Sequence, residues 1–323
     1  MDEDIQELKE IIANAPKQSA DDESKPAVTA SDNDEEISYS KDASMWAMRG
    51  GMYMPCEKAI DILPSGQYLV NADPNIGIYF EYHSASFDSL IQVPNSASNE
   101  VIQSINTFWN KEEHFRRLNY LWKRGILLWG PPGSGKTCTV QLISQENVKQ
   151  GGISLYLRVP ELTVEGLKVL RKIEPERKLL VIMEDIEAII RRHGDSEILA
   201  LLDGEMQIDN VVFIATTNYP ELLDKRLVNR PSRFDIVKKV GMPDDRARKA
   251  YLQAMHPDFS EDTELLRKWV EETKGFSIAH LKELIISTEV FEVEFEDAVE
   301  RLRLMAEIDI SSEDYDGNSM GLV

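Results

Sequence analysis

A polyphosphate-binding loop is indicated by eight consecutive residues, Gly130-Pro131-Pro132-Gly133-Ser134-Gly135-Lys136-Thr137. They follow the apolar run 125–129 and precede the helix-compatible run 138–143. A strand, a G-x-x-x-x-G-K-T loop and a helix in this order are typical of a P-loop. Its glycines let backbone N–H groups approach phosphate oxygens, and the positive end of the helix faces the same anion. The sequence therefore predicts a nucleotide site over residues 130–138; the alternative is an ordinary glycine-rich turn.

The end of this loop supplies the groups that act on the phosphates. Lys136 is placed to reach the β- and γ-phosphates, and the Thr137 hydroxyl is placed to ligate Mg²⁺. Cys138 follows directly, where a small apolar thiol packs easily. We therefore expect a nucleoside triphosphate and Mg²⁺ at this site.

Two adjacent carboxylates, Glu184 and Asp185, follow the apolar run 179–183. Such a run is typical of a central strand buried on both faces, and ligands bind beyond the carboxyl ends of parallel strands. One carboxylate would act through the Mg²⁺ shell, and the other would orient or deprotonate the attacking water. Hydrolysis is therefore expected in addition to binding. The alternative is that both acids begin a helix and cap it.

Four motifs in order resemble the AAA clade of the AAA+ ATPase superfamily. They are the P-loop, the acid pair, the run 212–220 (VFIATTNYP) and the run 227–235 (LVNRPSRFD). The resemblance covers about residues 98–305. It implies ATP as the substrate, Mg²⁺ as the cofactor, ring assembly and an activity that remodels or disassembles a protein partner.

The resemblance also assigns three further catalytic residues. Asn218 would be the sensor that holds the lytic water between the acids; the alternative is an asparagine that forms a turn. Arg230 and Arg233 match arginine fingers, which would reach a neighbouring subunit's site and neutralise charge on the γ-phosphate. For each arginine the alternative is a local salt bridge with nearby acids.

The acid pair has the reverse of the usual Asp-Glu order. In strict register, Glu184 takes the metal-side role and Asp185 the water-side role, and slow turnover is expected from the shorter Asp185 side chain. The same order occurs in the mitochondrial Rieske-protein-translocating AAA ATPases, which this core resembles. The short link 157–178 is part of that likeness. That family has a membrane span, and we expect none in this chain.

Other segments depart from the family pattern or match it weakly. Threading ATPases carry an aromatic pore loop where this chain has residues 159–166, which contain no aromatic residue. Residues 191–195 are either a second pore-facing loop or a solvated turn. The segment 275–281 resembles the lid of the family, with Ala279 where other clades carry an arginine. His280 is expected to be an exposed or packed helix residue rather than a base.

The positions of the strands and helices predict the fold class. Strands alternate with helices from residue 123 to 240, which indicates an α/β fold: a P-loop parallel sheet with helices on both faces. A C-terminal all-helical lid follows. The expected strands are 125–129, 153–158, 179–183, 211–216 and 236–240, and the expected lid helices are 245–255, 261–273, 277–289 and 294–305.

Five regions are expected along the chain. They are an acidic disordered arm over 1–42, a small β-containing module over 43–97, the nucleotide-binding core over 98–242, the helical lid over 243–305 and an acidic mobile tail over 306–323. The module contains strand-like runs at 67–70 and 77–82. Residues 98–120 are expected to be helical, with buried positions Val101, Ile105, Phe108, Trp109, Phe115 and Leu118.

Composition limits the partners. The chain has 323 residues and a formal net charge of −21, so nucleic acid is an unlikely partner because its phosphates would be repelled. No apolar stretch is long enough to span a bilayer, and the acidic N-terminus does not resemble a signal peptide. Cys56 and Cys138 form no disulfide framework, which favours a cytoplasmic, reducing location.

The sequence thus predicts a ring-forming, Mg²⁺- and ATP-dependent ATPase with arginine fingers acting in trans. A homo-oligomer is expected, with six subunits as the family default and seven as an alternative. A different reading is a slow ATP-dependent switch or assembly scaffold, motivated by the reversed acid pair and the missing pore aromatic. A DNA-remodelling or clamp-loading ATPase is a third reading, disfavoured by the charge.

Overall fold

The computed structural model describes residues 45–49, 52–56, 58–74, 76–83, 97–205, 208–228, 230, 232–259 and 261–307. The predicted arm over 1–42 and the part of the predicted tail from residue 308 lie outside these residues. The chain divides into two units, one formed by residues 1–65 and 72–79 and the other by residues 66–71 and 80–323. The first unit contains an antiparallel pair, β1 (Met45–Arg49) and β2 (Met52–Cys56).

A seven-stranded sheet organises the rest, in the order β4-β3-β6-β7-β8-β5-β9. From β3 to β9, each pair of neighbouring strands is parallel. The predicted α/β fold with a parallel sheet is confirmed, and all five predicted core strands are present. The strands are β3 (Gly66–Asp73), β4 (Gly77–Tyr82), β5 (Lys123–Trp129), β6 (Ile153–Tyr156), β7 (Leu179–Met183), β8 (Val211–Thr217) and β9 (Ile236–Lys239).

Strand β3 corrects the predicted boundary of the core. The sequence assigned it to a separate module over 43–97, but Gly66 to Leu69 pair in parallel with Ile153 to Tyr156 of β6. The sheet therefore begins well before residue 98. Pairing between strands so distant in the chain leaves no local signal in either strand, since strand patterns report burial and not partners.

Helices cover both faces of the sheet, as predicted. Gln67 of β3 donates from Nε2 to the Ser144 hydroxyl of α4 (Lys136–Lys149) at 2.8 Å. Val70, on the opposite face because side chains alternate along a strand, lies against Gly166 of α5 (Pro160–Ile173). A Cβ at Gly166 would lie 2.7 Å from the Val70 methyl groups, so glycine permits this close approach.

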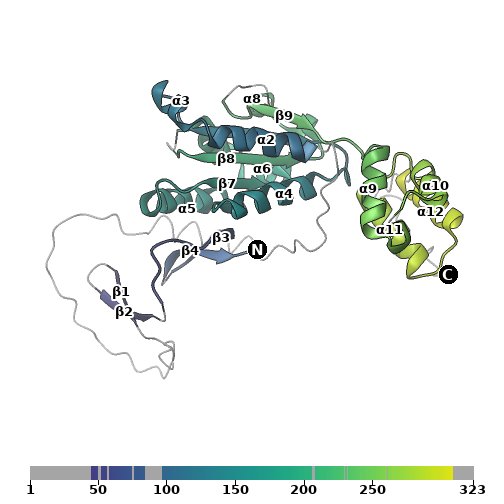
Figure 1. The fold of residues 1–323 in the computed structure, drawn as a ribbon. Coiled ribbons are helices and arrows are strands. Elements are labelled where there is room, and N and C mark those ends of the chain that lie inside the picture. Colours follow the sequence, from purple (N-terminus) through teal and green to yellow (C-terminus); the bar gives the residue numbers. More distant parts are fainter. Residues whose placement is uncertain are drawn as a thin grey trace, which may run out of the picture. The chain divides into compact units, whose positions relative to one another are not determined.

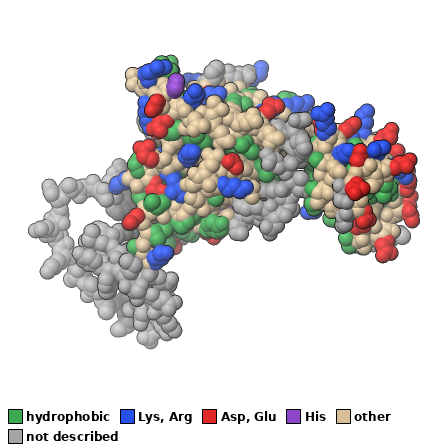
Figure 2. Space-filling model, viewed as in Figure 1, with side chains coloured by type: hydrophobic (Ala, Val, Ile, Leu, Met, Phe, Trp, Pro, Cys, Tyr) green, Lys and Arg blue, Asp and Glu red, His purple; other side chains and the backbone are tan. Residues whose placement is uncertain are grey.

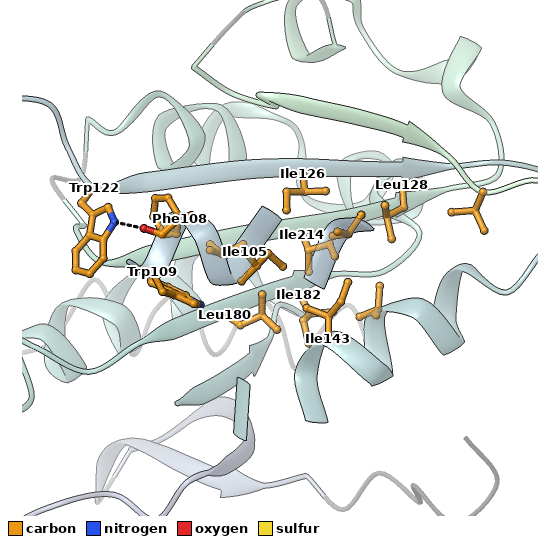
Figure 3. Packing of buried hydrophobic residues seen from close by; sticks show 14 residues of the cluster. Ile105, Phe108, Trp109, Trp122, Ile126, Leu128, Ile143, Leu180, Ile182 and Ile214 are labelled. Carbon is orange, nitrogen blue, oxygen red and sulfur yellow. Dashed lines mark hydrogen bonds between the residues drawn. The ribbon is translucent and has the colours of Figure 1, made fainter. Parts of the chain in front are cut away.

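The core on the α4 face is built around aromatic residues (Figure 3). Phe108 and Trp109, at the end of α2 (Ala97–Trp109), contact Trp122 with ring centroids 5.6 and 5.7 Å away. The Trp122 indole donates to the Phe108 carbonyl oxygen at 3.2 Å, which satisfies its polar atom inside the core. Ile126, Leu128, Leu180, Ile182 and Ile214 continue this core under α2 and α4.

The predicted helix over 98–120 is broken into α2 and α3 (Glu112–Arg117). Val101, Ile105, Phe108 and Trp109 are buried as predicted, and Phe115 is partly buried. Leu118 was predicted to be buried, but it is 57% exposed. The break at residues 110–111 changes the helical phase, so Leu118 leaves the stripe that α2 presents to the sheet.

Shorter elements connect the later strands, and a helical bundle follows (Figure 1). The connecting elements are α6 (Ile186–His193), α7 (Ser196–Asp203), the 3-10 turn Pro220–Leu222 and α8 (Lys225–Val228). The four predicted lid helices are found as α9 (Asp245–Met255), α10 (Glu264–Glu272), α11 (Ile278–Glu289) and α12 (Phe295–Glu307). This bundle has its own core, which includes Leu252, Phe259, Leu266, Trp269, Leu281 and Leu284.

Candidate active site

The glycine-rich loop joins β5 to α4, and two of its glycines adopt left-handed conformations. Gly133 has φ 72° and Gly135, which precedes the first residue of α4, has φ 98°. Side chains rarely adopt these values, so the loop conformation itself requires glycine. A Cβ at Gly133 would also lie 2.8 Å from the Ser277 hydroxyl at the start of α11. The loop thus presents backbone N–H groups at the N-terminus of α4, as an anion site requires.

Lys136 is folded onto the loop that precedes it. Its ammonium group donates to the carbonyl oxygens of Gly130 and Pro131 at 2.8 and 2.9 Å, and the residue is 7% exposed. Burial lowers the pKa of Lys136, while the charges of Asp185 and Glu187 oppose this shift. This ammonium group is placed in the loop where phosphate oxygens could replace the two neutral carbonyl oxygens as its partners.

Glu184 lies beside Thr137, which brings both predicted metal ligands together. Burial raises the pKa of Glu184, a hydrogen bond with Thr137 opposes that shift, and the Asp185 charge raises the pKa further. The Glu184 Oε1 atom is buried without a hydrogen-bond partner, and so is the Ser134 hydroxyl in the loop. Buried polar groups normally have partners, so these two atoms are free to accept or donate hydrogen bonds to a polar ligand.

The donor set fits Mg²⁺ only together with a phosphate. Within the described part of the chain, no group of three or more His, Cys, Asp or Glu side chains could hold a metal ion. Mg²⁺ is usually held by one or two carboxylates together with substrate phosphates. Thr137 and Glu184 match that smaller protein contribution.

Asp185, the other acid of the pair, is held next to Asn218. Its N–H donates to the Thr216 hydroxyl at 3.1 Å, and it has φ 48°, an uncommon conformation for a residue other than glycine. The Asn218 side-chain amide donates to Asp185 Oδ1 at 3.4 Å. The ends of β7 and β8 therefore bring the predicted sensor and the predicted water-side acid together.

Glu187 is a third carboxylate at this site, and sequence analysis missed it. It lies in the first turn of α6 and is 9% exposed. One oxygen accepts the Asn218 N–H at 3.4 Å, and the other is buried without a hydrogen-bond partner. An acid at a helix start is common for reasons of capping and dipole, so position alone did not identify it. Thr216 was missed because it precedes the sensor within an apolar strand.

The two candidate arginine fingers differ in burial and in their contacts. Arg233 is 5% exposed and makes a two-point contact with Asp203 at 2.7 and 2.6 Å. The Arg230 side chain is 60% exposed, and its nearest contact with the same carboxylate is 3.5 Å. Within this chain, Arg233 thus makes the local salt bridge that was the alternative to a finger role.

The two segments that sequence analysis compared with pore loops, 159–166 and 191–195, lie mostly in or next to helices. Residues 160–166 lie inside helix α5, with Leu162 and Val164 buried, so this segment is not a loop. Residues 191–193 end α6, and the Asp195 carboxylate pairs with Arg226 at 3.2 Å.

The lid segment begins helix α11. Ser277 caps this helix by accepting the His280 N–H at 3.2 Å, and its hydroxyl lies 2.7 Å from His280 Nδ1. The His280 ring packs near Phe276. His280 is therefore a packed helix residue, as expected.

No helix among the described residues is both long and apolar enough to cross a bilayer.

Residues 126–242 match the sequence model of a family described as ATPase family associated with various cellular activities (AAA), so this part of the chain is similar to an AAA ATPase domain. Over 201 residues the chain is 32% identical to a proteasome-activating nucleotidase of Saccharolobus islandicus (strain M.14.25 / Kamchatka #1), covering 54% of the chain and 49% of the relative. Over 240 residues it is 31% identical to the ATP-dependent zinc metalloprotease FtsH 3 of Sphaerobacter thermophilus, covering 63% and 47%. The chain spans about half the length of these curated relatives.

Proposed function

We propose that this protein is a ring-forming, Mg²⁺- and ATP-dependent ATPase that remodels or disassembles a protein partner. The observation that carries the proposal is the division of the acid pair: Glu184 lies beside Thr137, and Asp185 lies beside Asn218. A metal-side acid and a water-side acid are the two roles that phosphoanhydride hydrolysis needs.

Each residue has a defined task in this proposal. Backbone N–H groups of residues 130–138 bind the phosphates of ATP, and Lys136 leaves its loop carbonyls to contact them. Thr137 and Glu184 would hold Mg²⁺, which would supply positive charge next to the phosphates. Asp185 accepts a proton from the attacking water, and Asn218 fixes the position of that water.

Hydrolysis depends on assembly because Arg230, whose side chain is exposed, acts on the nucleotide of a neighbouring subunit. An arginine supplied in trans neutralises charge on the γ-phosphate in the transition state, so hydrolysis would depend on the ring. Six subunits are the family default, and seven are the alternative. A protein partner is supported by the names of the two relatives, one a proteasome-activating nucleotidase and the other an ATP-dependent metalloprotease.

The finer placement near the Rieske-protein-translocating subgroup rests on the order Glu184-Asp185 and on the short link 157–178. In this proposal Asp185 acts from a left-handed backbone, with φ 48°, and with the shorter of the two acidic side chains. Turnover is therefore expected to be slow. A reducing, cytoplasmic location remains part of the proposal.

The test is the concentration dependence of ATP turnover, with the solution mass measured in parallel. We expect the rate per chain to rise as the protein assembles. Arg230→Ala should lower kcat by about 1,000-fold while leaving ATP affinity within about twofold, because fingers act on the transition state. An equal loss of ATP binding, or full activity in a monomer, would contradict the proposal.

The slow-switch alternative is favoured by the reversed acid pair, and an Asp185→Asn control separates the two functions. Under the ATPase proposal this variant binds ATP and loses turnover. If wild-type turnover does not exceed that of Asp185→Asn, the protein is a nucleotide switch or scaffold.

A further inference from the structure

The loop that carries both arginines is fixed to the sheet at several points. The Arg233 N–H donates to the Arg230 carbonyl oxygen at 3.3 Å, which closes a turn between them, and Ser232 has φ 87°. Asp235 exchanges two hydrogen bonds with Gly125 of β5, each 2.9 Å long. The side chain of Arg230, in the same loop, is 60% exposed.

All three nitrogens of the Arg233 guanidinium are used within the chain. Nε and Nη2 donate to the two oxygens of Asp203 at 2.7 and 2.6 Å, and Nη1 donates to the Arg226 carbonyl oxygen at 2.6 Å. Lys123 adds a second tie, because its ammonium group donates to the carbonyl oxygens of Leu202 and Ser232. The end of α7 is thereby joined to the arginine loop from two sides.

This pair differs from a surface ion pair in its burial and geometry. The Arg233 and Asp203 side chains are 5% and 15% exposed, and the contact is a two-point one. Separating such a pair leaves a buried charge without a partner, which is costly. To reach a neighbour's nucleotide, Arg233 would have to break three hydrogen bonds, whereas the ion pair of Arg230 with Asp203, at 3.5 Å, is a longer contact made by an exposed side chain.

We infer that Arg233 is a positioning residue, which together with Asp203 and Lys123 forms a clamp that holds Arg230 toward the neighbouring subunit. Arg230 is then the one residue of the two that contacts the γ-phosphate. The inference rests on the proposed function, because it divides the work within the arginine pair of that site.

The first test compares Asp203→Ala, Arg233→Ala and the double variant in the full chain. We expect each to lower kcat by about 100-fold, the scale of a misplaced catalytic group, with ATP affinity within about twofold. The double variant should be no worse than either single variant, because both remove the same contact. Asp203→Asn keeps the side-chain volume and takes the place of Asp203→Ala if that protein does not fold.

Two kinetic outcomes would overturn the clamp. One is an Asp203→Ala protein within about twofold of wild-type kcat while Arg233→Ala is as inactive as Arg230→Ala, since a finger does not need Asp203. The other is a double variant whose loss is the product of the two single losses. Asp262→Ala is the matched control: it removes an exposed acid paired with Arg267 in the helical bundle and should leave kcat unchanged.

The second test measures how accessible Arg230 and Arg233 are to a chemical reagent, and it does not depend on ATP hydrolysis. Nucleotide-free protein is treated with the arginine reagent phenylglyoxal, and modified sites are found by mass spectrometry. We expect modification of Arg230 and protection of Arg233, and equal labelling of both residues would overturn the inference. If Arg230→Ala keeps full turnover, the proposed action in trans fails, while protection of Arg233 still shows that the clamp exists.

Discussion

At the scale of single residues, Asp203 shows how one carboxylate can serve two arginines. The hydrogen bond from Arg233 is the main cause that lowers the pKa of Asp203; burial opposes it, and the charges of Arg233, Arg230 and Lys123 add to the lowering. An aspartate in an unfolded chain titrates near about pH 3.9. Ionised Asp203 therefore stabilises the fold above that pH, and the stabilisation is lost as the pH falls through the lower folded pKa.

Asp203→Asn should lower the free energy of unfolding by about 2 kcal/mol near neutral pH, the value of a hydrogen bond to a charged group. The gap between wild type and variant should narrow as the pH falls below about 4, because the carboxylate of the unfolded wild-type chain is protonated first and that of the folded chain only at lower pH. Urea denaturation of both proteins, near neutral pH and below about pH 4, measures the difference in their free energies of unfolding. A gap that stays constant across them would show that Asp203 is not ionised in the folded state.

The site residues that belong to short continuous motifs could be predicted from the sequence. The loop, the acid pair and Asn218 each follow a strand, and the carboxyl ends of neighbouring parallel strands meet at one edge of the sheet. Asp203 and Arg233 are 30 residues apart, and no periodicity in the sequence links them. Glu187 resembles any acid in a first helical turn, so only its burial identified it.

At the scale of elements, the aromatic contact between α2 and Trp122 fixes the helix that precedes the nucleotide-binding strand (Figure 3). Phe108→Ala should cost about 3–5 kcal/mol of stability, because it leaves a cavity among large side chains. Leu118→Ala should change stability by about 0.5 kcal/mol or less, since Leu118 is exposed. Thermal unfolding of both variants measures the difference; equal losses would place Leu118 in the core after all.

The contact between β5 and the loop that carries Arg230 and Arg233 depends on Gly125, which has no Cβ atom. A Cβ at Gly125 would lie 1.7 Å from the Arg233 carbonyl oxygen, a backbone atom that cannot rotate away. Gly125→Ala should therefore displace the loop and lower both stability and kcat, by about 1–3 kcal/mol in stability. Gly241→Ala is the control, because nothing lies within 4 Å of a Cβ there. Normal activity in Gly125→Ala would show that the loop position is not critical.

Strand positions were predictable because buried strands have continuous apolar runs, as in residues 179–183. Helix ends were less predictable: the predicted helix 98–120 is interrupted by a turn at residues 110–111. Pairing was not predictable at all for β3, whose partner β6 lies more than 80 residues later in the chain.

At the scale of the whole molecule, the net charge of −21 sets which polymers the protein attracts. Acidic side chains are prominent on the visible surface of the α9–α12 bundle (Figure 2). Duplex DNA should therefore leave the ATPase rate unchanged, even at about 50 mM salt, where phosphate contacts are strong. A steady-state assay with and without DNA tests this, and stimulation that disappears with added salt would support the DNA-remodelling reading.

Strand β3 lies between β6 and β4. In a truncated protein that starts at residue 98, β6 would therefore become an edge strand with unpaired backbone N–H and C=O groups. Unpaired edge strands recruit other chains, so this protein should aggregate and elute in the void volume of a sizing column. A deletion of residues 1–57 keeps β3 and β4 and should elute as a defined species. Anyone who excises the ATPase by its family boundaries would thus remove a strand that shields it from self-association.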